Sequence, residues 1–177
     1  LLDECGGPGF FSGGAIIVTV KSSQGKIDGC DFQDLVDTWG AHGDHEPKPC
    51  ALSITQTTEV GTLYSVEEIL KLSELAHQHD MVIHMDGARF ANAISALGCS
   101  PATLTWQAGV DVLSFGATKN GAMAAEAVVF FREEMAVEFG RRLPLAGRRL
   151  AAPLALLSVI GLLFALAPHH LGRFTVD

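Results

Sequence analysis

The amino-acid sequence predicts an α/β fold, with a mostly parallel sheet and covering helices. Short apolar runs rich in Val, Ile and Leu alternate with segments whose apolar residues recur at helical spacing. Polar or glycine-containing sequence follows each run, as expected where a buried strand gives way to a loop. The chain has 177 residues, 48% of them hydrophobic and 18% charged, so it can bury the core of one ordinary domain. The expected strands are residues 15–20, 51–55, 81–85, 110–115 and 127–131.

Three helices are expected to accompany these strands. The clearest begins after Ser65, because Ser65 and Glu68 form a Ser-x-x-Glu capping box ahead of an apolar stripe. That stripe consists of Ile69, Leu72, Leu75 and Ala76. A second helix is expected from about Asp31, and a third around residues 101–108. The buried stripe of the second is expected to be Phe32, Leu35, Val36 and Trp39.

Charge and cysteine content exclude several classes of protein. The 20 acidic and 12 basic residues give a net charge of -8, which argues against nucleic acid as a partner. The four cysteines contain no Cys-x-x-Cys pair and follow no secretory signal, so we expect neither a zinc knuckle nor a disulfide framework. A reducing, cytoplasmic location fits this pattern best.

The histidines do not predict a metal site. His42 with His45, and His77 with His79, lack further ligands at metal-binding spacing, so we expect them to be solvated polar residues of a loop and a helix end. His84 lies inside an expected strand and is predicted to be a core histidine with satisfied hydrogen bonds.

The chain changes character near residue 139. The first 139 residues carry 19 of the 20 acidic residues, whereas residues 140–177 are basic and include an uncharged apolar stretch at 150–167. That stretch is near the minimum length for crossing a bilayer. We nevertheless prefer sequence divergence, misassembly or a shifted reading frame, and do not expect a membrane partner.

Two residues of opposite charge follow expected strands. Asp86 comes directly after residues 81–85, and Lys119 follows residues 112–115 by a short turn. Ligands of parallel sheets bind beyond the carboxyl ends of the strands, so both side chains should reach one rim. Asp and Lys are also common at the surface ends of strands, so either residue taken alone has a structural interpretation.

The strings around these residues resemble signature segments of the low-specificity threonine aldolases, which are pyridoxal-phosphate (PLP) enzymes of fold type I. Residues 85–90 read MDGARF, and residues 114–121 read SFGATKNG. Two further segments agree in order and distance: DECGGPGFF at residues 3–11 and SITQTTEVGT at residues 53–62. The resemblance covers residues 1–139, which would be part of the large, PLP-binding domain. Residues 140–177 no longer resemble the family.

The resemblance implies roles for three residues. Lys119 would hold the PLP aldehyde as a Schiff base, the internal aldimine. Asp86 would hold the pyridine nitrogen in its protonated form, so that the ring can accept electrons. Arg89 would bind cofactor or substrate carboxylate, because a guanidinium fork matches a planar anion.

Three further residues have two interpretations each. Thr118 and Ser114 would hydrogen-bond the cofactor, or they would simply close a turn beside the lysine. Glu59 would assist proton transfer from the substrate's β-hydroxyl, or it would be a salt-bridge residue of a loop.

The family's activity would be the cleavage of L-threonine or L-allo-threonine to glycine and acetaldehyde. The alternatives are a β-eliminating lyase or a phenylserine-type aldolase of the same fold, or an inactive truncated remnant. Relatives are homodimers or homotetramers that act on small β-hydroxy amino acids. They carry a phosphate-binding loop and a ring-stacking histidine ahead of the segment at which this chain starts, so we expect the chain to be a fragment.

Overall fold

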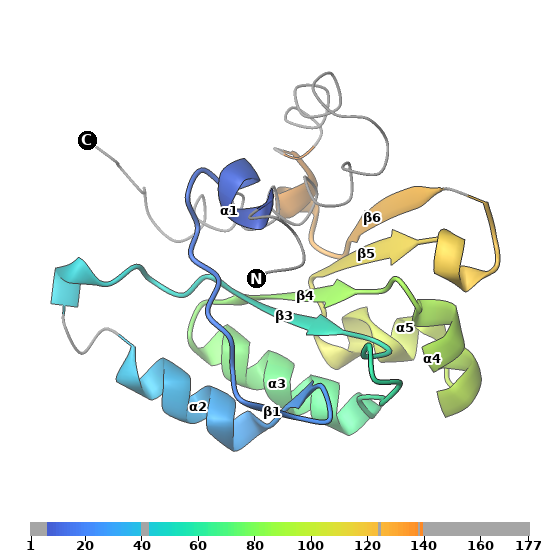
Figure 1. Ribbon diagram of the computed structural model, residues 1–177, viewed down its shortest axis with the longest axis horizontal. Coiled ribbons are helices and arrows are strands. Elements are labelled where there is room, and N and C mark those ends of the chain that lie inside the picture. Colours follow the sequence, from blue (N-terminus) through green and yellow to red (C-terminus); the bar gives the residue numbers. More distant parts are fainter. Residues whose placement is uncertain (1–6, 40–42, 124, 138, 140–177) are drawn as a thin grey trace. The chain divides into compact units, whose positions relative to one another are not determined.

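The computed structural model describes residues 7–39, 43–123, 125–137 and 139, and the chain divides into two compact units (Figure 1). One unit comprises residues 1–18 and 132–177 and includes helix α1 (Gly7–Phe11). The other, which we call the sheet unit, comprises residues 19–131. The sheet unit carries all six residues singled out by the sequence as candidate site residues.

The sheet unit is built on four strands in the order β3-β4-β5-β6. Their bounds are Ala51–Thr55 for β3, Val82–Asp86 for β4, Val112–Gly116 for β5 and Glu126–Phe130 for β6. The first three strands are parallel, and β6 is antiparallel to β5. The carboxyl ends of β3, β4 and β5 therefore share one edge of the sheet, and β6 starts there. The mostly parallel sheet confirms the predicted fold class.

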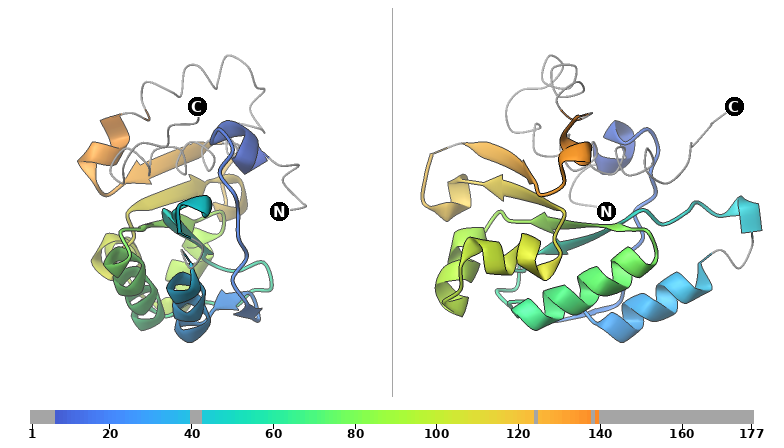
Figure 2. Two further views of the ribbon diagram at one scale, coloured as in Figure 1. Left: turned by 90° about the vertical axis from the view of Figure 1, so that its left-hand side faces the viewer. Right: turned by 180° about the vertical axis from the view of Figure 1, so that it is seen from behind.

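Helices cover one face of this sheet (Figures 1 and 2). They are α2 (Gly29–Thr38), α3 (Val66–Gln78), α4 (Phe90–Leu97) and α5 (Pro101–Leu104). Because successive side chains of a strand point to opposite faces, alternate strand residues pack against the helices. These buried residues are Leu52, Ile54, Ile83, Met85 and Leu113. The other face carries polar side chains toward the carboxyl ends of the strands: Ser53, Thr55, His84, Asp86 and Ser114.

Helix α3 follows its sequence signals closely. The Ser65 Oγ accepts a hydrogen bond from the Glu68 amide at 3.2 Å, and the Glu68 carboxylate accepts one from the Ser65 amide at 2.7 Å, which confirms the capping box. Helix α2 is also confirmed, with Phe32 and Val36 buried, although Trp39 lies just beyond its end. The third predicted helix is interrupted at Thr105, after which the 3-10 helix η2 (Trp106–Ala108) continues.

Some expectations were wrong. Residues 15–20 form no strand, and Ile16 is 70% exposed, because an apolar run becomes a strand only where a neighbour can complete its hydrogen bonds. Strand β6 was expected to be a buried strand like the others, but none of its five residues is buried. His77 is not simply a solvated helix-end residue, since its Nε2 lies 2.9 Å from Oδ2 of buried Asp111.

Residues 140–177, which include the apolar stretch at 150–167, lie outside the described residues, as does His42. Both interpretations of the tail therefore stay predictions. Within the described part of the chain, no helix combines the length and apolar character needed to span a bilayer.

Candidate active site

Asp86 and Lys119 lie at the same edge of the sheet. Asp86 is the last residue of β4, and Lys119 lies in the 3-10 helix η3 (Thr118–Asn120), directly after β5. Their loops are adjacent, because the Gly87 amide donates to the Ser114 carbonyl oxygen at 2.7 Å. The two residues therefore lie at the same end of the sheet, as the sequence predicted, and not at opposite ends.

Asn120 ties the two loops together through its side-chain amide. Its Nδ2 donates to the carbonyl oxygen of Gly116 at 2.6 Å and lies 3.2 Å from the carbonyl oxygens of both Gly87 and Ala88. Its Oδ1 accepts a hydrogen bond from the Ala91 amide at 2.9 Å. The residue after the lysine thus holds the backbone that follows the aspartate. Asn120 belongs to the SFGATKNG segment, but its role depends on contacts that the sequence does not reveal.

The two charged groups remain available for a ligand. The Asp86 carboxylate accepts one hydrogen bond through Oδ1, from the Ala88 amide at 2.9 Å, and is half-buried. Within the described residues, Oδ2 has no hydrogen-bond partner. Lys119 is exposed, and its ammonium makes no ion pair with any described residue. A ligand could therefore contact a carboxylate and an amine at this edge without breaking an existing salt bridge.

A second carboxylate, which sequence reasoning missed, lies beside Asp86. Glu126 begins β6, and its register places it opposite Gly116. Its Oε2 would lie only 2.9 Å from a β-carbon added to Gly116, so the carboxylate rests directly on the end of β5. Partial burial raises the pKa of Glu126, and the negative charge of Asp86 raises it further. The site edge is therefore rich in negative charge and suits a cationic group of a ligand.

Ser114 and Thr118 occupy different environments. Ser114 is 1% exposed, and its Oγ lies 2.8 Å from His84 Nε2, so its hydroxyl is already engaged within the sheet. His84 in turn confirms the prediction of a satisfied core histidine, since its Nδ1 lies 2.8 Å from Ser53 Oγ. Thr118 is exposed in the turn that carries Lys119.

Arg89 and Glu59 lie in the loops that follow β4 and β3. Arg89 is half-buried and immediately precedes α4. Glu59 is exposed, and it makes no salt bridge with another described residue. Both loops leave the sheet at the edge that carries Asp86, so both side chains belong to the same region of the sheet unit.

The loop that contains Glu59 is closed by a buried glutamine. Gln56 is 0% exposed; its Nε2 donates to the Tyr64 carbonyl oxygen at 2.8 Å, and its Oε1 accepts from the Tyr64 amide at 3.0 Å. The backbone amide of Gln56 donates to the backbone carbonyl oxygen of Asp86 at 2.9 Å. The loop is therefore joined both to itself and to the end of β4.

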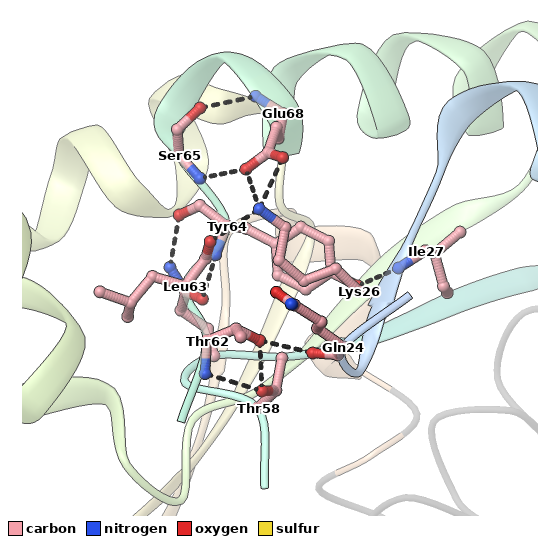
Figure 3. A network of polar contacts seen from close by, with 10 residues as sticks. Gln24, Lys26, Ile27, Thr58, Thr62, Leu63, Tyr64, Ser65 and Glu68 are labelled. Atoms are coloured by element: carbon pink, nitrogen blue, oxygen red, sulfur yellow. Dashed lines mark hydrogen bonds and ion pairs between the residues drawn. The ribbon is translucent and has the colours of Figure 1, made fainter. Parts of the chain in front are cut away.

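A short hairpin holds the same loop from outside (Figure 3). Strands β1 (Ser22–Ser23) and β2 (Lys26–Ile27) form this hairpin. The Lys26 ammonium pairs with the Glu68 carboxylate at 2.6 Å and donates to the Leu63 carbonyl oxygen at 2.9 Å. The Thr62 hydroxyl donates to the Gln24 carbonyl oxygen at 2.7 Å. These contacts restrict the loop that presents Glu59.

Residues 1–161 match the family described as Beta-eliminating lyase. The chain belongs to the Beta-eliminating lyase family. The chain is 44% identical over 163 residues to the low-specificity L-threonine aldolase of Pseudomonas sp. (strain NCIMB 10558), covering 91% of the chain and 46% of the relative. It is also 44% identical over 157 residues to the low-specificity L-threonine aldolase of Pseudomonas aeruginosa, covering 85% of the chain and 45% of the relative.

A solved structure extends the likeness to the fold. The threonine aldolase of Leishmania major superposes on the chain with a TM-score of 0.63 and 28% sequence identity. The match covers 86% of the chain and 45% of the Leishmania protein. The resemblance to threonine aldolases stated from the sequence is thus confirmed, although the family match continues to residue 161, beyond the limit of 139 expected from the sequence. The chain spans about half the length of the curated relatives it matches.

Proposed function

We propose that the intact protein is a PLP-dependent carbon–carbon lyase that cleaves L-threonine or L-allo-threonine to glycine and acetaldehyde. One observation carries the proposal: Asp86 and Lys119 lie on one sheet edge, in loops that Asn120 joins. The identity to two low-specificity L-threonine aldolases supports the substrate class.

The residues at this edge suit the cofactor. Asp86 would offer Oδ2 to a protonated ring nitrogen, and Lys119, whose amine forms no ion pair with a described residue, would offer that amine to an aldehyde. Glu126 adds negative charge on the same side, which favours a cationic ring. When bound, PLP supplies an electron sink for the carbanion that forms as the Cα–Cβ bond breaks.

Two loop residues would serve the substrate. Arg89 would bind the substrate carboxylate through its guanidinium fork. Glu59 would take the proton from the β-hydroxyl, since its carboxylate is exposed and without a salt bridge to the described residues. Thr118, in the same turn as Lys119, would donate its hydroxyl to an oxygen atom of the cofactor. Ser114 would support the carboxyl end of β5 through its contact with His84.

Covalent labelling tests the assignment of Lys119. The chain is incubated with PLP and reduced with borohydride, and the modified lysine is identified by peptide mapping. We expect Lys119 to be labelled ahead of Lys21 and Lys71, which are also exposed and serve as internal controls. A Lys119→Ala variant should lose the specific adduct. Equal labelling of the three lysines would refute the assignment and favour the inactive remnant.

Product analysis separates the aldolase from its rivals. We expect L-threonine to yield glycine and acetaldehyde with the intact protein. Ammonia and a keto acid would instead identify a β-eliminating lyase, the reaction class in the family's description. Preferential cleavage of phenylserine would identify an aldolase for aromatic substrates.

We also propose that the intact protein is a cytoplasmic homodimer or homotetramer. The resemblance to threonine aldolases supports this assembly, because their cofactor pocket lies at a subunit interface. Light scattering on the intact protein would test it: a monomeric mass would be incompatible with a pocket shared between subunits.

A further inference from the structure

Buried His84 links three neighbouring strands through a chain of hydrogen bonds. It is 2% exposed, its Nδ1 lies 2.8 Å from Ser53 Oγ on β3, and its Nε2 lies 2.8 Å from Ser114 Oγ on β5. Both ring nitrogens are therefore satisfied by hydroxyl groups. His84 takes no part in the chemistry proposed for Asp86 and Lys119, yet it lies two residues before Asp86 on the same face of β4.

The serine partners suit a neutral ring. A hydroxyl can donate or accept, so the two serines satisfy either neutral tautomer without a charge. Burial lowers the pKa of His84 to about 4, and it outweighs the charge of Asp86, which acts in the opposite direction. In the part of the chain that the structure describes, the ring hydrogen-bonds only to these hydroxyls, whereas a carboxylate in place of either serine would favour the imidazolium.

A charged ring at this position would change the environment of Asp86. An imidazolium two residues away would attract the carboxylate that the proposed function assigns to the cofactor's ring nitrogen. A neutral His84 ring provides no positive charge to attract the Asp86 carboxylate. Among the described residues, the carboxylate accepts one hydrogen bond, from the Ala88 amide, and its charge acts on the like-charged Glu126, whose pKa it raises.

We propose that His84 is a positioning residue: as a neutral bridge between Ser53 and Ser114, it fixes the strand ends at Asp86 and leaves that carboxylate's charge for the cofactor's ring nitrogen. This inference rests on the proposed function. It assigns Ser53 and Ser114 a shared task that does not require either to touch the cofactor.

Two substitutions at Ser53 separate charge from shape. Ser53 is exposed, so both Ser53→Asp and Ser53→Asn should fold. Nuclear magnetic resonance of the isotope-labelled imidazole, without cofactor, should show His84 neutral at neutral pH in the wild type and in Ser53→Asn. In Ser53→Asp it should be doubly protonated. PLP uptake at Lys119, measured by borohydride trapping over a PLP titration, should need about tenfold more PLP in Ser53→Asp than in Ser53→Asn.

A second pair of variants tests the bridge itself. His84→Phe keeps an uncharged ring of similar size but removes both hydrogen bonds, and it should weaken PLP uptake by about tenfold. Ile83→Ala lies on the opposite face of the same strand and creates a cavity, so it controls for lost stability. It should lower the urea midpoint and leave PLP uptake unchanged under conditions where both variants are folded.

Three results would overturn the inference. They are a His84 that stays neutral in Ser53→Asp, equal PLP uptake by the Ser53→Asp and Ser53→Asn chains, and equal losses of uptake in His84→Phe and Ile83→Ala. Failure of the proposed function has a different signature, because the wild-type chain itself would then form no adduct at Lys119. That result would remove the inference as well, whatever the protonation of His84.

Discussion

Replacing Asn120 with alanine should loosen both loops of the site at once. The substitution removes the donor to Gly116 and to the loop that follows Asp86, and it removes the acceptor of the Ala91 amide. Two amide protons and one acceptor make about three hydrogen bonds, each with a net contribution of about 0.5–1.5 kcal/mol. Because Asn120 is half-buried, water will replace some of these hydrogen bonds, and we expect the free energy of unfolding to fall by about 2 kcal/mol.

Asn120→Asp is the sharper variant because it keeps the shape of the side chain. It replaces the donating nitrogen with a carboxylate oxygen that faces three carbonyl oxygens, the nearest now 2.6 Å from Nδ2. Repulsion should make this variant at least as destabilised as Asn120→Ala, and no cavity can account for the loss. Asn92→Ala is the matched control, since Asn92 is exposed in α4 and its replacement should change stability by less than about 0.5 kcal/mol.

Urea unfolding and PLP trapping measure the two consequences separately. A loss of about 2 kcal/mol shifts the folding equilibrium by roughly thirtyfold, which is well resolved in a urea titration. PLP trapping at Lys119 should weaken as well, because the lysine and Asp86 lose their common support. If both Asn120 variants match Asn92→Ala in the two assays, the reasoning that Asn120 joins the loops is wrong.

Three further predictions concern single side chains and are checked by urea titration. Gly87→Ala should lower the free energy of unfolding by about 1–3 kcal/mol, because the added β-carbon would lie 2.6 Å from a side-chain carbon of buried Leu113. Gly29→Ala is the control: its β-carbon would meet open space, so the free energy of unfolding should hardly change. Burial raises the pKa of Glu68, but its hydrogen bonds from Lys26 and the Ser65 amide and the positive charges nearby outweigh burial and lower it. Glu68→Gln should therefore cost about 0.5–1 kcal/mol at neutral pH, a difference that disappears as the pH falls below the ordinary value of 4.5; persistence in acid would refute it. The raised pKa of Glu126 means that its ionised form opposes folding, so Glu126→Gln should stabilise by at most a few tenths of a kcal/mol at neutral pH and by nothing in acid, whereas destabilisation would contradict the repulsion from Asp86.

Local signals predicted those elements whose cause is local. The capping box of α3 lies within four residues, so Ser65 and Glu68 predict the start of the helix without any tertiary contact. The core strands β3, β4 and β5 were also predicted to within two residues, because burial on the helix-covered face requires apolar side chains. Residues 15–20 have the same composition and form no strand, since composition does not specify a pairing neighbour.

The candidate site divides in the same way. Asp86 and Lys119 could be placed on one rim because both follow strands of a parallel sheet. Glu126 could not be placed there from the sequence, because its approach to Gly116 depends on β6 running antiparallel to β5. Neither the direction nor the register of a strand can be read from five apolar residues. The roles of His84 and Asn120 likewise depend on atoms more than 25 positions away in the chain.

These contacts give a physical reason why the two strings that carry the family resemblance occur together. The Asn120 side chain donates to backbone carbonyls of residues 87 and 88, so its geometry depends on the tight turn after Asp86. That turn requires Gly87, because a β-carbon there would also lie 3.0 Å from the Ser114 carbonyl oxygen. A change in either string therefore alters the support of the charged group in the other. The lysine and the aspartate are consequently expected to be lost or retained as a pair, and a variant that repositions one loop should disturb the chemistry assigned to both.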